Sequence, residues 1–412
     1  MKELIEKISK EFQIDKSNWV LTKFGDVAIQ QKGKVDRENT NLTRYVKGEH
    51  MGSEDLHLRS WGELQDEYLG PAFIRRFDEG DILYGSRRTY LRKVVIAPFS
   101  GITSNTTFVI RANEKNIDKR LLPFIMMSEG FTENSVRNSK GSVNPYINWK
   151  DIAKYEFLLP PKDQQTQLAK LLWAMDEVIE SETQLYDRLF ITSLSNRKQF
   201  IENGFTQKEE SKKIKFGQIC SRWQTAKLKE VCDLIGGNAF KSTDFTEKGD
   251  NQVLRIGNIT AEGFDLSKSP VFISNISEKE RKYLIPKGAI VISLTGTNGK
   301  RDYGFPSLME EHNMHLLNQR LVMLICKKEK IIPEFVYLIS KMELFLSKFY
   351  LNATGTANQA NVSISDISEI EIPLPSLEEQ RMIVEKMRKF GDSIFEVKLK
   401  ISHSQSLQKS II

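Results

Sequence analysis

The chain has 412 residues, of which 40% are hydrophobic and 28% charged, a composition of folded globular proteins that excludes disordered and collagen-like chains. Lys and Arg exceed Asp and Glu only by 60 to 54, so the net charge alone identifies no nucleic-acid partner. No apolar run approaches the roughly 18 residues of a membrane span, and three scattered cysteines without CxxC spacing indicate a reducing cytoplasm.

Segments of the first half of the chain recur in the same order in the second half. The last matched pair aligns without a gap and shares an Asp-Ile start, a Pro and a Gln. The preserved order predicts a duplicated fold, rather than chance similarity of strand and turn sequences. The matched pairs are 19–27 with 223–231, 80–86 with 288–294, 105–110 with 318–323, and 151–165 with 366–380.

Each copy begins with a β-rich part, in which short apolar runs alternate with Gly, Pro and Asn, as in 107–110 and 289–293. A strand bounded by proline ends this part at 157–161 and again at 372–375. Proline stops the strand and allows a helix to begin. We therefore expect the α+β class, with two pseudo-symmetric mixed α/β domains.

A long helix follows the proline-bounded strand in each copy. Ser376 and Glu379 have the spacing of a capping box at the start of the second helix. Apolar residues then recur at alternating spacings of three and four, which predicts an antiparallel coiled coil; a helix packed on its own domain is the alternative for either stripe. The expected seam residues are Leu168, Leu172, Met175, Ile179, Leu185, Leu189, Ile383, Met387, Phe390, Ile394, Val397 and Ile401.

The pattern gives five segments along the chain. The first domain also includes an expected amphipathic N-terminal helix at Leu4–Phe12. Two modules held by paired helices would suit a target with two separated halves. The expected boundaries are 1–160 for the first domain, 161–204 for the first spacer helix, 205–217 for a polar linker, 218–374 for the second domain and 375–412 for the second spacer helix.

Motifs that would carry catalysis are weak. His312 and His315 have helical ligand spacing but no further ligands nearby. Gly296–Arg301 lacks the spacing of a phosphate loop. Asn144-Pro-Tyr146 only partly matches the Asn-Pro-Pro-Tyr signature of amino-methyltransferases, and it is interpreted as a turn. We therefore predict no catalytic residue, no metal site and no cofactor in this chain.

Polar and basic loops occupy equivalent places in the two copies. Arg and Lys can bind phosphates or guanine, and Asn or Gln can bind adenine, so these loops are candidates for DNA contact, although any surface loop has a similar composition. The candidates are Arg87, Arg88, Tyr90, Arg92, Lys93, Lys140, Ser142, Asn144 and Tyr146 in the first copy, and Asn298, Lys300, Arg301, Asn318, Gln319, Arg320, Asn358, Gln359 and Asn361 in the second.

With these features, the sequence resembles the DNA-specificity subunits of type I restriction–modification enzymes. The resemblance rests on the repeated order of segments, on the Pro-x-x-x-x-Gln start of both helices (Pro160 to Gln165, Pro375 to Gln380), and on the long helices themselves. It covers essentially the whole chain. Base-contacting residues do not transfer, because recognition domains differ among members.

The resemblance implies that each globular domain recognises one half of a bipartite site in double-stranded DNA. It further implies that the coiled coil sets the spacer and binds two modification (methyltransferase) subunits, with restriction (motor-nuclease) subunits joining for cleavage. S-adenosylmethionine, ATP and Mg would be held by those partners, so this chain would be a non-catalytic, cytoplasmic protein. The alternatives are a pseudo-symmetric protein–protein scaffold without DNA recognition and a methyltransferase in its own right.

Overall fold

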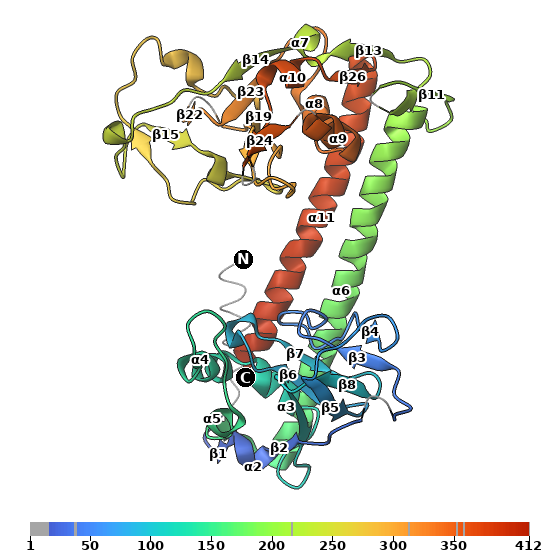
Figure 1. The fold of residues 1–412 in the computed structure, drawn as a ribbon, viewed down its shortest axis with the longest axis vertical. Helices are drawn as coiled ribbons and strands as arrows, with labels where there is room; N and C mark the ends of the chain where they lie inside the picture. Colours follow the sequence, from blue (N-terminus) through green and yellow to red (C-terminus); the bar gives the residue numbers. More distant parts are fainter. Residues whose placement is uncertain are drawn as a thin grey trace. The chain divides into compact units, whose positions relative to one another are not determined.

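The computed structural model describes residues 16–36, 39–215, 217–311, 314–351, 353–356 and 359–411. The expected N-terminal helix at Leu4–Phe12 lies outside these residues. The chain divides into two compact units: unit 1 comprises Met1–Tyr186 and Glu396–Ile412, and unit 2 comprises Asp187–Phe395. Two long helices contribute to both units (Figure 1).

Unit 1 is built around two four-stranded sheets, with orders β2-β9-β6-β7 and β4-β3-β8-β5, and a separate pair β1-β10. The core between the first sheet, the short helices and α6 contains Phe24, Phe131 and Leu172. Its elements are β1 (Val20–Lys23), α2 (Phe24–Val27), β2 (Ala28–Gln31), β3 (Arg44–Val46), β4 (Gly62–Glu63), β5 (Phe73–Phe77), β6 (Ile82–Gly85), η1 (Thr89–Leu91), β7 (Val94–Ile96), β8 (Gly101–Ser104), β9 (Thr107–Ala112), α3 (Leu122–Met127), α4 (Glu129–Arg137), α5 (Trp149–Ile152), β10 (Glu156–Leu159) and the first part of α6 (Lys162–Asn203).

Unit 2 contains the same plan with more short strands. Its elements after α6 are β11 (Ser211–Lys213), β12 (Gln218–Cys220), β13 (Gln224–Lys227), α7 (Leu228–Val231), β14 (Cys232–Gly236), η2 (Ser242–Asp244), β15 (Asn251–Leu254), η3 (Ile256–Asn258), β16 (Ile259–Thr260), β17 (Gly263–Phe264), β18 (Phe272–Ile273), η4 (Arg281–Tyr283), β19 (Ile290–Ser293), β20 (Thr295–Gly296), β21 (Pro306–Leu308), β22 (His315–Leu317), β23 (Leu321–Cys326), α8 (Pro333–Ser340), α9 (Glu343–Leu351), β24 (Thr354–Thr356), β25 (Gln359–Asn361), α10 (Ile364–Ser368), β26 (Glu371–Leu374) and the first part of α11 (Leu377–Ile411).

The sheets confirm the duplication read from the sequence. The order β14-β23-β19-β21 in unit 2 matches β2-β9-β6-β7 in unit 1, and the pair β13-β26 matches β1-β10. Each unit also has one parallel strand pair at the same place, β3 with β8 and β15 with β22. Gly80 and Gly288, in the turns before β6 and β19, both have a positive φ (83° and 87°), a conformation that glycine adopts without the steric cost of a Cβ.

The two long helices run antiparallel within each unit. In unit 1 the Gln408 amide donates to the Leu172 carbonyl (3.1 Å) and the Ser404 hydroxyl donates to Glu182 (3.3 Å), so later residues of α11 lie beside earlier residues of α6. In unit 2 the end of α6, at Phe200, shares a core with the start of α11, at Ile383. Seam positions expected from the sequence are buried or half-buried, with one exception.

That exception is Leu185, whose side chain is 47% exposed. A heptad continued from Ile179 by steps of three and four reaches Glu182, Tyr186 and Leu189. Tyr186 is half-buried at the position that the seam requires, while Leu185 is exposed. The prediction for Leu185 was wrong because it followed side-chain hydrophobicity rather than spacing.

A buried glutamine ties the first turn of each long helix to its domain. Gln165 donates to the Pro160 carbonyl (2.9 Å) and accepts from the Asp118 amide (2.7 Å). Gln380 donates to the Pro375 carbonyl (2.9 Å) and accepts from the Ile332 amide (2.9 Å). The glutamine of the recurring Pro-x-x-x-x-Gln pattern therefore has a structural role, which is to fix the first turn of each long helix to its domain.

The expected capping box at the start of α11 is half formed. The Ser376 hydroxyl accepts from the Glu379 amide at 3.2 Å, as an N-cap does. The Glu379 carboxylate, however, does not return to Ser376; it is buried and accepts from the Phe205 amide (3.0 Å), from Arg222 (2.6 Å) and from the Trp223 indole (3.0 Å). It thereby joins the segment after α6 to the start of α11 within unit 2.

Candidate nucleic-acid interface

The candidate loops of unit 1 are brought together by backbone hydrogen bonds at Ser86, the residue after β6. The Ser86 amide and hydroxyl both donate to the Thr106 carbonyl (3.2 and 2.6 Å), and the Ile147 amide donates to the Ser86 carbonyl (2.9 Å). Segments that are 20 and 61 residues away in the sequence thus meet at the end of one strand. The loops at 86–93 and 138–146 form one surface, which we call the unit 1 loop surface.

The second of these loops is a small hairpin. Lys140 and Tyr146 exchange backbone hydrogen bonds (2.8 and 2.9 Å), and Arg87 forms a β-bridge with Tyr146. Arg88 fixes the hairpin further: its amide donates to the Pro145 carbonyl (2.7 Å), and its guanidinium donates to the Asn144 side chain (2.7 Å). The hairpin therefore presents its side chains from a backbone held at both ends.

Two further predicted cations in unit 1, Arg92 and Lys93, are bonded to other parts of the fold. Arg92 pairs with Glu129 and with Glu54 (3.2 Å), and the hydrogen bond that its guanidinium donates to Glu129 raises the pKa of Arg92. The Lys93 ammonium donates to the Gly48 carbonyl. Both side chains are half-buried, so the structure favours a role for them in holding loops, and a DNA contact at Arg92 or Lys93 stays a prediction.

Unit 2 repeats this junction with different residues. The Leu294 amide donates to the Arg320 carbonyl (2.9 Å), and the Val362 amide donates to the Leu294 carbonyl (2.9 Å). Strand β20 then pairs with β25, which also pairs with β24. Leu294 thus takes the place of Ser86, and the segments 295–303, 318–320, 353–356 and 359–361 form the unit 2 loop surface.

The loop after β20 is closed by an internal carboxylate. Asp302 accepts hydrogen bonds from the Thr297 amide (2.8 Å) and hydroxyl (2.7 Å), and the hydroxyl hydrogen bond lowers the pKa of Asp302. Arg301 pairs with Glu343, and its guanidinium lies 5.2 Å from the centre of the Tyr350 ring. Lys300 is exposed on the same loop.

The structure brings the predicted residues that it describes onto these two surfaces, and their contact with DNA stays a prediction. Asn358 lies outside the described residues. The exposed candidates are Arg87, Arg88, Tyr90, Lys140, Ser142, Asn144, Tyr146, Asn298, Lys300, Arg301, Gln319 and Arg320, and the half-buried ones are Arg92, Lys93, Asn318, Gln359 and Asn361.

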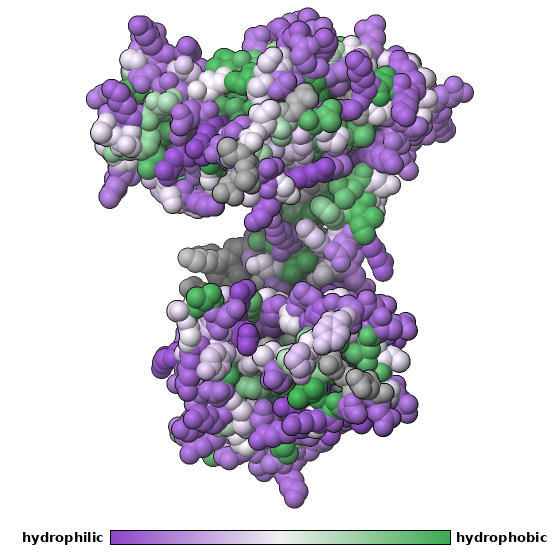
Figure 2. Space-filling view, viewed as in Figure 1, coloured by the Kyte–Doolittle hydropathy of each residue, from purple (hydrophilic) through white to green (hydrophobic). Residues whose placement is uncertain are grey.

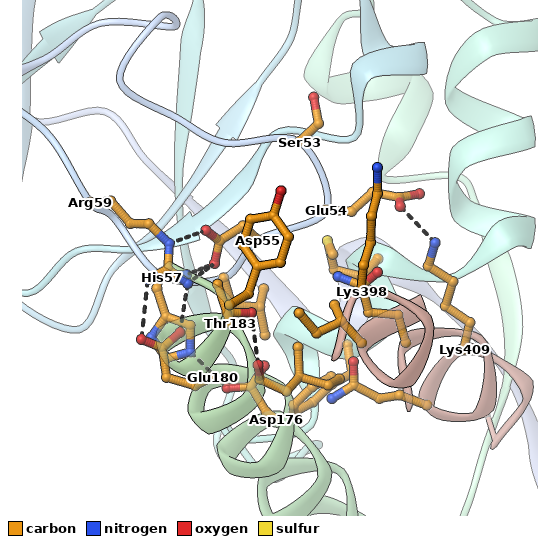
Figure 3. Close-up of a pocket in the computed structure, with 18 of the residues that line it drawn as sticks. Ser53, Glu54, Asp55, His57, Arg59, Asp176, Glu180, Thr183, Lys398 and Lys409 are labelled. Carbon is orange, nitrogen blue, oxygen red and sulfur yellow. Dashed lines mark hydrogen bonds and ion pairs between the residues drawn. The ribbon is translucent and has the colours of Figure 1, made fainter. Parts of the chain in front are cut away.

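A cavity of about 430 Å³ in unit 1 lies between loop 53–59 and the two long helices. Figure 3 shows His57 and Arg59 of this loop facing Asp176 and Glu180 of α6. His57 Nε2 lies 2.8 Å from Asp176, and Arg59 bonds Glu180 at 2.6 and 3.1 Å.

These ion pairs change the titration of their members. The hydrogen bond to Asp176 raises the pKa of His57, and Arg59 lowers the pKa of Glu180 to about 2. Lys409 of α11 pairs with Glu54 of the same loop at 2.7 Å. These ion pairs therefore fasten loop 53–59 to α6 and α11.

Sequence reasoning missed this loop altogether. Its partners on α6 are 119 and 121 residues away, so no local pattern could have indicated the pairs. Val143, at the tip of the unit 1 hairpin, was also missed, because the prediction selected polar and basic loop residues and Val143 is apolar.

Two other findings bear on function. Among the residues that the structure describes, no group of three or more His, Cys, Asp or Glu side chains is arranged to hold a metal ion; His315 contacts Glu311 at 3.0 Å, and His312 lies outside the described part. Within that same part, none of the helices combines the length and the apolar character that a membrane span requires.

Comparison with known proteins identifies the fold and the family. The family model of the type I restriction modification DNA specificity domain matches twice, at residues 16–211 and 221–402. Two solved structures share the fold: a chain from a study of assembly and conformational transition in a type I restriction–modification system (TM-score 0.54, 18% identity), and the type I S subunit from M. genitalium (TM-score 0.55, 14% identity). Each alignment covers 96% of both chains.

Relatives of similar length carry the same description. The type I restriction enzyme MjaVIII specificity subunit of Methanocaldococcus jannaschii is 27% identical over 383 residues, covering 87% of this chain and 86% of its own. The putative MjaX specificity subunit of the same organism is 23% identical over 397 residues, covering 93% and 89%. The two matched domains, the duplicated sheets and the paired helices agree with one another, and the chain belongs to the family of type I restriction–modification DNA specificity subunits.

Proposed function

We propose that this chain selects the DNA target of a type I restriction–modification complex, with each loop surface recognising one half of a bipartite site. The observation that carries the proposal is the junction that recurs in both units, where a residue after a central strand holds two loops by backbone hydrogen bonds. Backbone anchoring leaves the loop side chains available for recognition. The loops differ in sequence between the units, as two different half-sites require.

The residues of the unit 1 loop surface suit a duplex. Arg87, Arg88 and Lys140 supply positive charge for phosphates, and Ser142 and Asn144 supply donors and acceptors for base edges. Acidic groups close by are paired: Asp151 lies 3.8 Å from the Lys140 ammonium, and Glu129 pairs with Arg92. The unit 2 loop surface has Lys300, Arg301 and Arg320 in corresponding roles.

The exposed apolar side chains of the long helices provide a place for partner subunits. In unit 1 these include Val178 and Leu185, and in unit 2 they include Ile191, Leu194 and Phe395. Elsewhere, on the face drawn in Figure 2, hydrophilic residues dominate the surface of each unit, with small hydrophobic patches between them. We propose that two modification subunits bind these helix faces and that restriction subunits join the complex.

In this proposal the chain is non-catalytic and cytoplasmic. S-adenosylmethionine is bound by the modification subunits, and ATP and Mg by the motor subunits. The chain supplies affinity through phosphate contacts, sequence selection through base contacts, and a spacer through its paired helices.

Selection from random duplexes, by this chain in complex with its modification subunits, tests the proposal. Two short motifs at a constant separation are the expected result. A protein–protein scaffold would enrich no sequence, and a single enriched motif would contradict a role in recognition for one of the units.

The salt dependence of binding tests the phosphate contacts. Arg87→Ala should reduce the slope of log affinity against log salt by about one, because each phosphate contact contributes about 0.9 to that slope. Lys32→Ala, which removes an exposed cation of unit 1 outside the two loops, is the matched control and should leave the slope unchanged. Equal slopes for Arg87→Ala and the wild type would remove Arg87 from the interface.

A further inference from the structure

The unit 1 hairpin carries at its tip an apolar side chain that the fold does not bury. Val143 is 86% exposed, whereas most valines of unit 1's sheets are fully buried. Its neighbours Ser142 and Asn144 are polar and also exposed. Val143 thus contributes nothing to the core, and its side chain is accessible to a ligand bound at the unit 1 loop surface.

The backbone that presents Val143 is fixed. Lys140 and Tyr146 close the hairpin by two backbone hydrogen bonds, and Gly141 takes the positive φ (90°) that the turn into the tip requires. Arg88 binds both the Pro145 carbonyl and the Asn144 side chain at 2.7 Å. A side chain held in this way can contact one defined position of a ligand.

The surroundings of Val143 favour a negatively charged ligand that carries a small apolar group. Arg87, Arg88 and Lys140 make this surface basic, and the Lys140 side chain is 52% exposed. The apolar area at the tip is that of a single side chain, flanked by serine and asparagine, which is too little for an apolar protein interface. In the major groove of DNA, the 5-methyl group of thymine is the apolar group that distinguishes one base from the others.

We propose that Val143 contacts the 5-methyl group of a thymine in the half-site recognised by unit 1, and so selects an A·T pair at that position. The inference rests on the proposed function and goes beyond it by assigning one base feature to one residue. Arg88 acts here as a positioning residue, because it holds Asn144 and Pro145 beside Val143.

Replacing thymine with deoxyuridine removes the methyl group and keeps every hydrogen-bonding group of the base pair. In the selected duplex, bound by the complete complex of this chain with its modification subunits, each thymine of the two half-sites is replaced in turn. One replacement in one half-site should weaken binding about fourfold, as the loss of a buried methyl group predicts. For Val143→Ala, the same replacement should have no effect, and binding to the unmodified duplex should already be weaker by about that factor.

Val20→Ala is the matched control, because Val20 is an exposed valine (65%) on β1, outside both loops. This variant should retain the full wild-type response to deoxyuridine. Thermal unfolding of Val143→Ala should match that of the wild type, since the side chain is exposed.

The outcomes separate the two proposals. A half-site without any A·T pair, no response of the wild type to deoxyuridine, or a response that persists in Val143→Ala would each overturn the assignment of Val143 while leaving sequence-specific binding intact. If no duplex is enriched at all, the proposed function itself is wrong.

Discussion

Gln380 lies in the first turn of α11, fully buried, and replacing it with leucine tests whether the Pro-x-x-x-x-Gln pattern is structural. Leucine has a similar volume but no polar atoms. The substitution removes the hydrogen bonds from the Gln380 amide to the Pro375 carbonyl (2.9 Å) and the Lys330 carbonyl (3.2 Å), and the one from the Ile332 amide to the Gln380 oxygen (2.9 Å). The backbone groups of these three residues then lose their partner.

The expected loss in the free energy of unfolding follows from these three hydrogen bonds. Each hydrogen bond contributes about 1 kcal/mol to stability, so Gln380→Leu should reduce the free energy of unfolding of unit 2 by about 3 kcal/mol. For a unit of this size, that corresponds to a fall of about 6–12 °C in the unfolding temperature. The equivalent change in unit 1, Gln165→Leu, removes the two hydrogen bonds made with Pro160 and Asp118 and should cost about 2 kcal/mol.

Differential scanning calorimetry of the full-length chain measures both effects. Gln167→Leu is the control, because Gln167 is exposed on the same turn of α6 as Gln165 and should shift stability by less than about 0.5 kcal/mol. If Gln380→Leu behaved like this control, or if Gln165→Leu were the more destabilising of the two, counting these hydrogen bonds would be the wrong explanation of the pattern.

Three further predictions concern the loops and helices. The hydrogen bond to Asp176 raises the pKa of His57 in the folded chain, so protonated His57 stabilises the fold below the unfolded pKa of about 6.5, and this stabilisation is lost as pH rises through the folded pKa. In unfolding experiments at about pH 6 and about pH 8, the wild type should be more stable than His57→Gln only at the lower pH. An equal difference at both pH values would contradict the role of His57 protonation. Gly355→Val should abolish recognition of one half-site in the duplex selection, since a Cβ at Gly355 would lie 1.8 Å from the Gln359 carbonyl oxygen. Gly257→Ala in η3, where the added Cβ would meet only the Lys268 side chain at 4.0 Å, should not. One heptad inserted in each long helix should lengthen the preferred spacer and keep both half-sites, and an unchanged spacer would exclude the helices as its determinant.

The duplicated fold was predictable because its signals are local and occur twice. Strand patterns, proline-bounded strand ends and heptad spacing each depend on a few neighbouring residues. Their repetition in the same order allowed one half to support the interpretation of the other. The equivalent positions of the loops followed from that order, and the structure confirms it at Ser86 and Leu294.

What could not be predicted depends on partners far away in the sequence. Arg92 and Lys93 look like their neighbours Arg87 and Arg88 in a basic loop, yet Arg92 is held by Glu54 and Glu129. A charged residue in a loop gives no local sign of whether it faces solvent or a carboxylate from another element. The same limit hid the ion pairs of loop 53–59 with α6.

At each loop surface, some residues hold the loops in place and other residues are exposed for recognition. This separation affects how such a protein can change its DNA target. Backbone hydrogen bonds assemble each surface, at Ser86 with Thr106 and Ile147, and at Leu294 with Arg320 and Val362, and the Ser86 hydroxyl adds one side-chain bond to Thr106. Backbone bonds of this kind form with almost any side chain, so substitutions at exposed loop positions leave the frame in place. Arg92 and Asp302 hold the loops with their side chains. Substitutions at these two positions would therefore destabilise the loops. New specificities should therefore arise at exposed side chains such as Val143 and Lys300, while the positions that anchor the loops stay fixed.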